Sequence, residues 1–169
     1  MQYSLLALPP ELHLLILTHL PFPSRTHLSL TCTYFHTLIP PMAHSELLAA
    51  ESTEFAVSRD LYACRYCLRL RHSSEFGDRM LHKRRGRRGK AAGRRFCVEC
   101  GLCPRGGGEA RYGPGAMVVR GGVVYVVCKG CGRFGEMGGV HGHGSDVCRA
   151  CFGNSEMYAS RWKVAALPG

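Results

Sequence analysis

The first 76 residues contain no glycine, although the chain has 21 of them, and six of its nine prolines lie within residues 1–41. No apolar run approaches the roughly 20 residues that cross a bilayer, because Pro9, Pro10 and Glu11 interrupt the longest N-terminal one. No positive charge precedes Arg25, whereas a secretory signal has one near its start. The sequence therefore predicts an intracellular protein, in the cytoplasm or the nucleus, with reduced cysteines.

Sequence motifs of catalysis are missing as well. The chain contains no Gly-x-Ser-x-Gly, no phosphate-binding P-loop and no His-Glu-x-x-His. A nucleophilic cysteine needs a partnered, partly exposed thiolate, but nearly all cysteines here occur in pairs suited to metal binding. We therefore expect a protein that is not an enzyme and that acts by binding.

Positive charge is concentrated in one segment. The formal net charge is +10, yet residues 1–60 are net acidic, and residues 82–95 alone hold eight lysines and arginines. Such a run, interspersed with glycine, predicts a disordered, solvated loop. A nuclear localisation signal or a phosphate-binding arm is the functional alternative. No aromatic residue alternates with these charges, which argues against stacking on single-stranded nucleic acid.

Composition and charge both change near residue 60 and predict two domains, residues 1–60 and residues 61–169. Domains this small bury too little apolar surface to fold easily on a hydrophobic core alone. The predicted fold class is a small mixed α + β fold stabilised by metal. It consists of an N-terminal helical module followed by a zinc-knuckle domain with a β-hairpin.

Short helices are predicted in the N-terminal region. Behind Pro9 and Pro10, apolar residues recur at helical spacing at positions Leu12, Leu15, Ile16 and Leu20. Pro21 ends this helix, and Ser24 is the predicted N-cap of the second. Residues 43–57 predict a single further helix of good helix formers. Helices this short cannot bury all their apolar faces against each other, so the remainder predicts a partner surface.

Four Cys-x-x-Cys pairs occur within 90 residues. They are Cys64 and Cys67, Cys97 and Cys100, Cys128 and Cys131, and Cys148 and Cys151. Two intervening residues allow a tight turn to aim both thiolates at one ion, and two pairs complete a tetrahedral site. Gly101 and Gly132 follow two of the pairs, as in zinc knuckles, where glycine permits a positive φ. The sequence predicts two structural zinc ions; iron–sulfur clusters are the alternative, because four cysteines do not decide the metal.

The pairing of these cysteines is left open between two arrangements. Sequential pairing joins the first pair to the second and the third to the fourth, whereas a ribbon-like arrangement joins the two middle pairs. We favour the sequential one. Residues 117–127 predict a β-hairpin around Gly121 and Gly122 that leads into Cys128. Four further residues are treated as non-ligands, with the last three as possible substitutes: Cys32, Cys103, His141 and His143.

Residues 8–40 (LPPELHLLILTHLPFPSRTHLSLTCTYFHTLIP) resemble an F-box. The matching positions are Leu8, Pro9, Glu11, Leu12, Ile16, Leu20, Leu28, Leu30, Cys32 and Phe35. The chain departs from the family pattern at Thr31, where valine is usual, and at Thr33, where a basic residue is usual. The resemblance implies that the helices bind the Skp-type adaptor of a cullin ubiquitin ligase. It implies these contact residues: Leu8, Pro9, Leu12, Ile16, Leu20 and Leu28.

The segments LYACRYCLRLR, RRFCVECGL and YVVCKGCGRFG resemble the cysteine-rich part of a group of F-box proteins from filamentous fungi. Together the two resemblances imply a non-catalytic F-box adaptor that recruits a target protein to an SCF-like ubiquitin ligase. The zinc domain is then the candidate surface for the unknown target. The alternative is a zinc-stabilised protein that binds nucleic acid through residues 82–95. Neither function involves a membrane.

Overall fold

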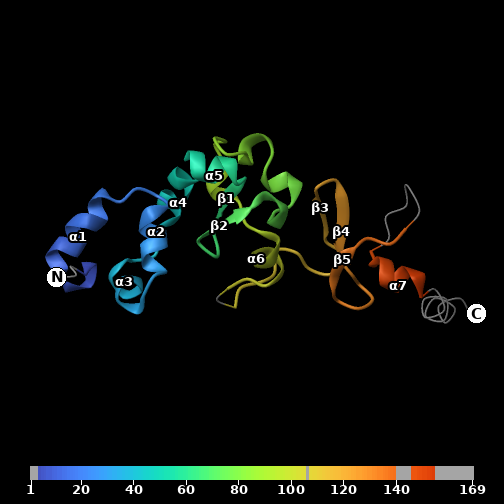
Figure 1. Cartoon of the computed structure of the whole chain (residues 1–169). Coiled ribbons are helices and arrows are strands. Elements are labelled where there is room, and N and C mark those ends of the chain that lie inside the picture. Colours follow the sequence, from blue (N-terminus) through green and yellow to red (C-terminus); the bar gives the residue numbers. More distant parts are fainter. Residues whose placement is uncertain (1–3, 106, 140–145, 155–169) are drawn as a thin grey trace, which may run out of the picture.

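The computed structural model describes residues 4–105, 107–139 and 146–154. Figure 1 shows an elongated chain, with the first helices at one end and a small sheet and a last short helix at the other. In these ranges, none of the helices combines the length and the apolar character that crossing a bilayer requires.

Five α-helices precede the first strand. They are α1 (Pro10–His19), α2 (Ser24–Ser29), α3 (Thr33–Leu38), α4 (His44–Ala50) and α5 (Glu54–Ser58). A single-turn 3-10 helix, η1 (Leu5–Ala7), lies before α1. Leu17, Phe35 and Ile39 form the buried core of the first three helices. The following residues pack against this core from its margins: Leu20, Leu28, Cys32 and Leu38.

Two local predictions in this region are wrong. Ser24 is the first residue of α2 rather than its N-cap, a position that Pro23 occupies without a side-chain hydrogen bond. Residues 43–57 form two helices rather than one. The second begins because Thr53 caps it, its Oγ1 accepting a hydrogen bond from the amide of Ala56 at 3.4 Å. The first ends where Glu51 turns into the interior.

Helices α4 and α5 connect the helical end of the chain to the cysteine-rich part. On one side, the ring of Phe55 lies 5.5 Å from that of Phe22, edge to face, and Arg25 pairs with Glu46 at 3.8 Å. On the other side, both helices lie against strand β1 (Leu61–Cys64). The domain boundary at residue 60 stays a prediction. Helices α4 and α5, which precede this boundary, pack against β1, which follows it.

The cysteine-rich part contains two antiparallel sheets. Strand β1 pairs with β2 (Arg69–His72). The second sheet has the order β3–β4–β5, with β3 (Met117–Arg120), β4 (Val123–Val127) and β5 (Phe134–Glu136). Gly121 and Gly122 adopt φ values of 55° and 79° between β3 and β4, as the predicted hairpin requires. Two short helices complete the fold: α6 (Val98–Leu102) and α7 (Arg149–Gly153).

The tip of the β3–β4 hairpin is attached to the two 3-10 helices that follow β2. Asp78, in the 3-10 helix η3 (Asp78–Met80), accepts hydrogen bonds from the amides of Gly121 at 2.8 Å and Gly122 at 3.1 Å. Arg120 donates to the carbonyl oxygen of Ser74 in η2 (Ser73–Glu75), with its Nε at 2.9 Å. These contacts join segments more than 40 residues apart, so the hairpin is attached to the segment that follows β2.

The basic segment is folded, which contradicts the prediction of a disordered loop. It contains two 3-10 helices, η4 (Lys83–Arg85) and η5 (Ala92–Arg94). Arg95 is fully buried and forms an ion pair with the equally buried Glu51. Arg87 donates to the carbonyl oxygens of Glu51 and of Leu61, the latter at 2.8 Å. The partners of these arginines are a carboxylate and backbone carbonyl oxygens more than 20 residues earlier, so composition alone did not reveal them.

Candidate metal centres and partner-binding helix

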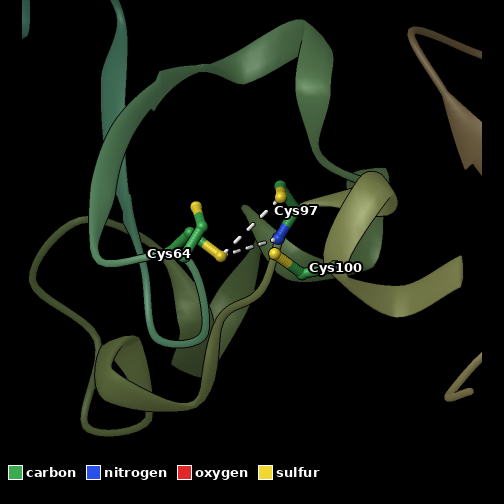
Figure 2. A group of neighbouring side chains, drawn as sticks. Cys64, Cys97 and Cys100 are labelled. Atoms are coloured by element: carbon green, nitrogen blue, oxygen red, sulfur yellow. Dashed lines mark hydrogen bonds between the residues drawn. The ribbon is translucent and has the colours of Figure 1, made fainter. Parts of the chain in front are cut away.

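The first cysteine group lies between the turn that joins β1 to β2 and helix α6. Cys64 ends β1, Cys67 lies in the turn that follows, Cys97 is the N-cap of α6 and Cys100 lies within α6. Their four sulfur atoms lie within 4.8 Å of one another. Figure 2 shows Cys64 facing Cys97 and Cys100 across the site. The sequence element that builds each half is a tight Cys-x-x-Cys turn.

The geometry of this group fits a tetrahedral metal. The Cys64 and Cys97 sulfurs are 3.7 Å apart. A tetrahedron with zinc–sulfur bonds of about 2.3 Å has sulfur–sulfur edges of about 3.8 Å, whereas a disulfide has a separation of about 2.05 Å. All four cysteines are at most 8% exposed, and Phe76 and Met80 pack against them. The sulfurs are therefore held at the spacing of metal ligands in a dry environment.

Hydrogen bonds within the first group favour one thiolate, that of Cys64. The hydrogen bond between the sulfurs of Cys64 and Cys97 lowers the pKa of Cys64 to about 4, although burial opposes this change. The same interaction raises the pKa of Cys97, and burial adds to the increase. The amide of Cys97 also donates to the sulfur of Cys64 at 3.3 Å. One anionic sulfur is thus stabilised by its neighbours, and a divalent cation would supply the charge to deprotonate the others.

The second cysteine group is built in the same way at the other end of the chain. Cys128 and Cys131 follow β4, and Cys148 and Cys151 lie at the start of α7, again with all sulfurs within 4.8 Å. The sulfurs of Cys131 and Cys148 are 3.7 Å apart. Burial raises the pKa of Cys128, but backbone amides from Cys148, Cys131 and Gly130 outweigh it and lower the pKa to about 6. The amide of Gly130 is 3.3 Å from the Cys128 sulfur.

The second group is more open to solvent than the first. Cys131 is exposed and Cys151 is half-buried, whereas Cys128 and Cys148 are buried. A cavity of about 500 Å³ adjoins the group. Its lining includes three of the four cysteines together with residues of β5 and α7: Cys131, Cys148, Cys151, Phe134 and Arg149. A reagent in solution therefore has a route to the second group that the first does not offer.

The structure groups the cysteine pairs sequentially and not in the ribbon-like arrangement. In the sequence, the hairpin lies between the second pair and the third. Cys103 is exposed and belongs to neither group, and Cys32 is half-buried at the N-cap of α3. His141 and His143 lie outside the described residues.

The two knuckle glycines have different roles. Gly132 has a φ of 73°, as predicted for a residue that follows a metal-binding turn. Gly101 lies within α6 and is not among the residues with positive φ. A Cβ atom at Gly101 would lie 2.4 Å from the ring of Tyr112. Glycine at position 101 therefore allows the close approach of a tyrosine, and the explanation by positive φ is wrong for this residue.

Helix α1 and the turn before it present apolar side chains to solvent. Leu5, Leu6 and Leu8 precede the helix, and Leu12, Leu14 and Leu15 follow within it, with exposures between 36% and 56%. The helix buries His13 and Leu17 instead. His13 is 2% exposed and hydrogen-bonds the hydroxyl of Tyr34 at 2.7 Å and the carbonyl oxygen of Leu5 at 2.8 Å. A histidine thus fastens η1 and α3 to α1, which leaves the leucines uncovered.

The predicted partner-contact residues are distributed between this surface and the core. Leu8, Pro9 and Leu12 are exposed and Ile16 is half-buried. Leu20 and Leu28 are half-buried against the core of the first three helices. The contact role of all six stays a prediction.

Sequence reasoning did not identify several polar residues that connect distant parts of the fold. Glu51, Arg87 and Arg95 have no local signal, because their partners are distant in the sequence. The inward orientation of His13 could have been suspected, because it lies four residues before Leu17, at helical spacing.

Comparison with known protein families supports the F-box interpretation. Residues 5–40 match the F-box domain, which spans η1 and the first three helices and confirms the F-box predicted at residues 8–40. The match ends before α4. No curated protein matched the chain, and no solved structure did. The resemblance to a fungal group of F-box proteins therefore stays a prediction.

Proposed function

Because residues 5–40 form an F-box domain, we propose that this protein is a non-catalytic adaptor that recruits a target protein to an SCF-like ubiquitin ligase. F-box domains bind the Skp-type subunit of cullin ligases, and ubiquitin transfer belongs to other subunits. The observation that carries the proposal is the uncovered row of leucines on η1 and α1. Exposed apolar side chains gathered on a short helix and the turn before it favour a protein partner. The proposal also implies an intracellular protein.

The exposed leucines define the test of this function. We expect the variant Leu12→Asp/Leu15→Asp to lose binding to the Skp-type subunit in a pull-down, because a carboxylate cannot be buried in an apolar contact without a partner. Both side chains are largely exposed, 42% and 56%, so the substitutions leave the helical core intact. Val57→Asp is the control for an added carboxylate at an exposed apolar position, since Val57 is 52% exposed and lies outside the F-box match.

Two outcomes would contradict this proposal. Absence of binding by the unmodified chain would reject the adaptor function. Equal loss with Val57→Asp would show that added charge, and not the α1 surface, is responsible.

We further propose that each cysteine group holds one structural zinc ion. Four sulfur ligands fill a tetrahedral zinc site and leave no position for water or substrate, which favours a structural role. The sulfur spacing of 3.7 Å in both groups supports this assignment. Elemental analysis that finds iron and inorganic sulfide instead of zinc would replace it with iron–sulfur clusters.

The cysteine-rich part is the candidate target-binding surface. Figure 1 places the second sheet and α7 at the opposite end of the molecule from α1. A subunit bound to α1 would therefore leave this end accessible. The identity of the target follows from no residue described above, so the proposal extends only to the location of its binding surface.

A further inference from the structure

Five of the eight lysines and arginines in residues 82–95 carry no counter-charge. Each is exposed, and none takes part in an ion pair within the described part of the chain. We call this set the basic lobe: Lys83, Arg84, Arg88, Lys90 and Arg94. The other three cations of the segment are used internally, two at Glu51 and one, Arg85, against the sulfur of Met80.

The basic lobe is held in place by the fold. Arg87 and Arg95 fasten it from beneath, through the backbone and the carboxylate of Glu51 respectively. Within the lobe, the amide of Ala91 donates to the carbonyl oxygen of Arg84 at 2.8 Å. Charges fixed on a folded segment lose less conformational freedom on binding than charges on a disordered tail. The inward arginines therefore serve to present the outward ones.

A further cation lies beside the lobe. Arg65 is exposed, and its amide donates to the carbonyl oxygen of Arg95 at 3.0 Å. Its guanidinium lies 5.2 Å from the ring centroid of Tyr66 and forms no ion pair among the described residues. Arg65, the residue directly after β1, thus adds an exposed cation next to the C-terminal end of the basic segment.

The make-up of this surface distinguishes among classes of anionic partner. Its exposed residues within 82–95 are His82 and the five cations, with no large apolar side chain among them. Protein and peptide partners are held by aromatic or aliphatic anchors in pockets, which the lobe lacks. Single-stranded nucleic acid needs free aromatic faces. The nearby Phe96 is half-buried, with the rings of Tyr66 and Tyr112 each 5.6 Å away.

We propose that the basic lobe binds the phosphate backbone of double-stranded nucleic acid without recognising its sequence. Repeated phosphates require only correctly placed cations, and this is what the lobe offers. If each of the five cations contacts one phosphate, a plot of the logarithm of the binding constant against the logarithm of the salt concentration should have a slope of about −4 to −5. This activity goes beyond the adaptor function and depends on a different surface.

The test uses the full chain, purified with zinc, and mixed-sequence DNA and RNA duplexes of about 20 base pairs. Binding is followed by fluorescence anisotropy between about 50 and 200 mM salt. The lobe variant is Arg84→Gln/Arg88→Gln/Arg94→Gln. The matched control is Arg105→Gln/Arg111→Gln/Arg133→Gln, three exposed arginines that form no ion pair in the described part of the chain. The two variants have the same net charge, so a difference between them reports location.

We expect the lobe variant to lose about tenfold or more in affinity at 100 mM salt and to have a slope shallower by about 3. The control should stay within about threefold of the unmodified chain, with one duplex type or both bound. Equal loss in both variants, no duplex binding at about 50 mM salt, or equally tight binding of a single strand or of polyglutamate would overturn the proposal. Loss of nuclear accumulation in the lobe variant without duplex binding would assign the lobe to import instead.

Discussion

A single carboxylate, that of Glu51, determines where the basic segment lies. It accepts a hydrogen bond from the amide of Ala63 at 2.9 Å and pairs with Arg95, and all of these groups are buried. Arg95 also donates to the carbonyl oxygen of Arg85 at 3.0 Å and is two residues from Cys97, a member of the first cysteine group. Helix α4, the basic segment and the first cysteine group are therefore connected through one acidic side chain.

We expect Glu51→Ala to lower the thermal unfolding midpoint by about 10 °C. A buried ion pair adds little to stability overall, but removing one partner leaves an uncompensated buried charge, at a cost of about 3–5 kcal/mol. Glu51→Gln should be milder, because its carbonyl oxygen can still accept from Ala63 and Arg95. Glu54→Ala is the control, an exposed glutamate in the next helix. If both alanine variants unfold at the same temperature, the pair has no such role.

Residue chemistry could be predicted from the sequence where spacing alone determines it. The eight paired cysteines were identified because two intervening residues place both thiolates at one ion. The inward histidine of α1 and the Glu51–Arg95 pair were not identified, because a polar residue is expected at the surface unless its partner is known. That partner, for Arg95, is 44 residues away in the sequence and is brought near only by folding.

At the scale of elements, predictions succeeded where proline or glycine marks the boundary. Pro10 begins α1, and the pair Gly121 and Gly122 turns the β3–β4 hairpin. The break between α4 and α5 was missed because residues 43–57 contain neither proline nor glycine. Their helix propensity is high throughout, and the break follows from tertiary contacts of Glu51 that override propensity.

The elements around the two cysteine groups predict different rates of metal loss. The first group lies beneath Phe76 and Met80, with no member above 8% exposed. The second is held by the five-residue helix α7 and contains the exposed Cys131. We expect a coloured zinc chelator to remove about two zinc ions per chain in two kinetic phases, the faster from the second group, because access limits attack on the metal–sulfur bonds.

Cysteine variants assign the two phases. Cys131→Ser should abolish or accelerate the fast phase and leave the slow one, and Cys67→Ser, the matched change in the first group, should do the reverse. A single phase in the unmodified chain, or a fast phase that persists unchanged in Cys131→Ser, would contradict the assignment. A total near one equivalent would contradict the proposal of two zinc sites.

At the scale of the whole molecule, the buried clusters differ in what they are made of. Four of the six buried members of the cluster at the first site are cysteines, and so are two of the four at the second. The cluster of the first three helices consists of Leu17, Phe35 and Ile39 and includes neither cysteine group. The proposed zinc ions would therefore contribute to the folding of the cysteine-rich part and not to the core of the first three helices.

This division predicts the outcome of removing both metals. Structural zinc contributes an apparent ~10–16 kcal/mol in small domains, and the cysteine-rich part has few apolar side chains to replace it. We expect chelation to expose the amides of β1 to β5 to hydrogen exchange while those of α1 and α3 stay protected. Binding of the Skp-type subunit should persist within a few-fold, because its proposed surface rests on the core of Leu17, Phe35 and Ile39. Uniform loss of protection would show instead that the F-box helices depend on the metal-bound half through α4 and α5.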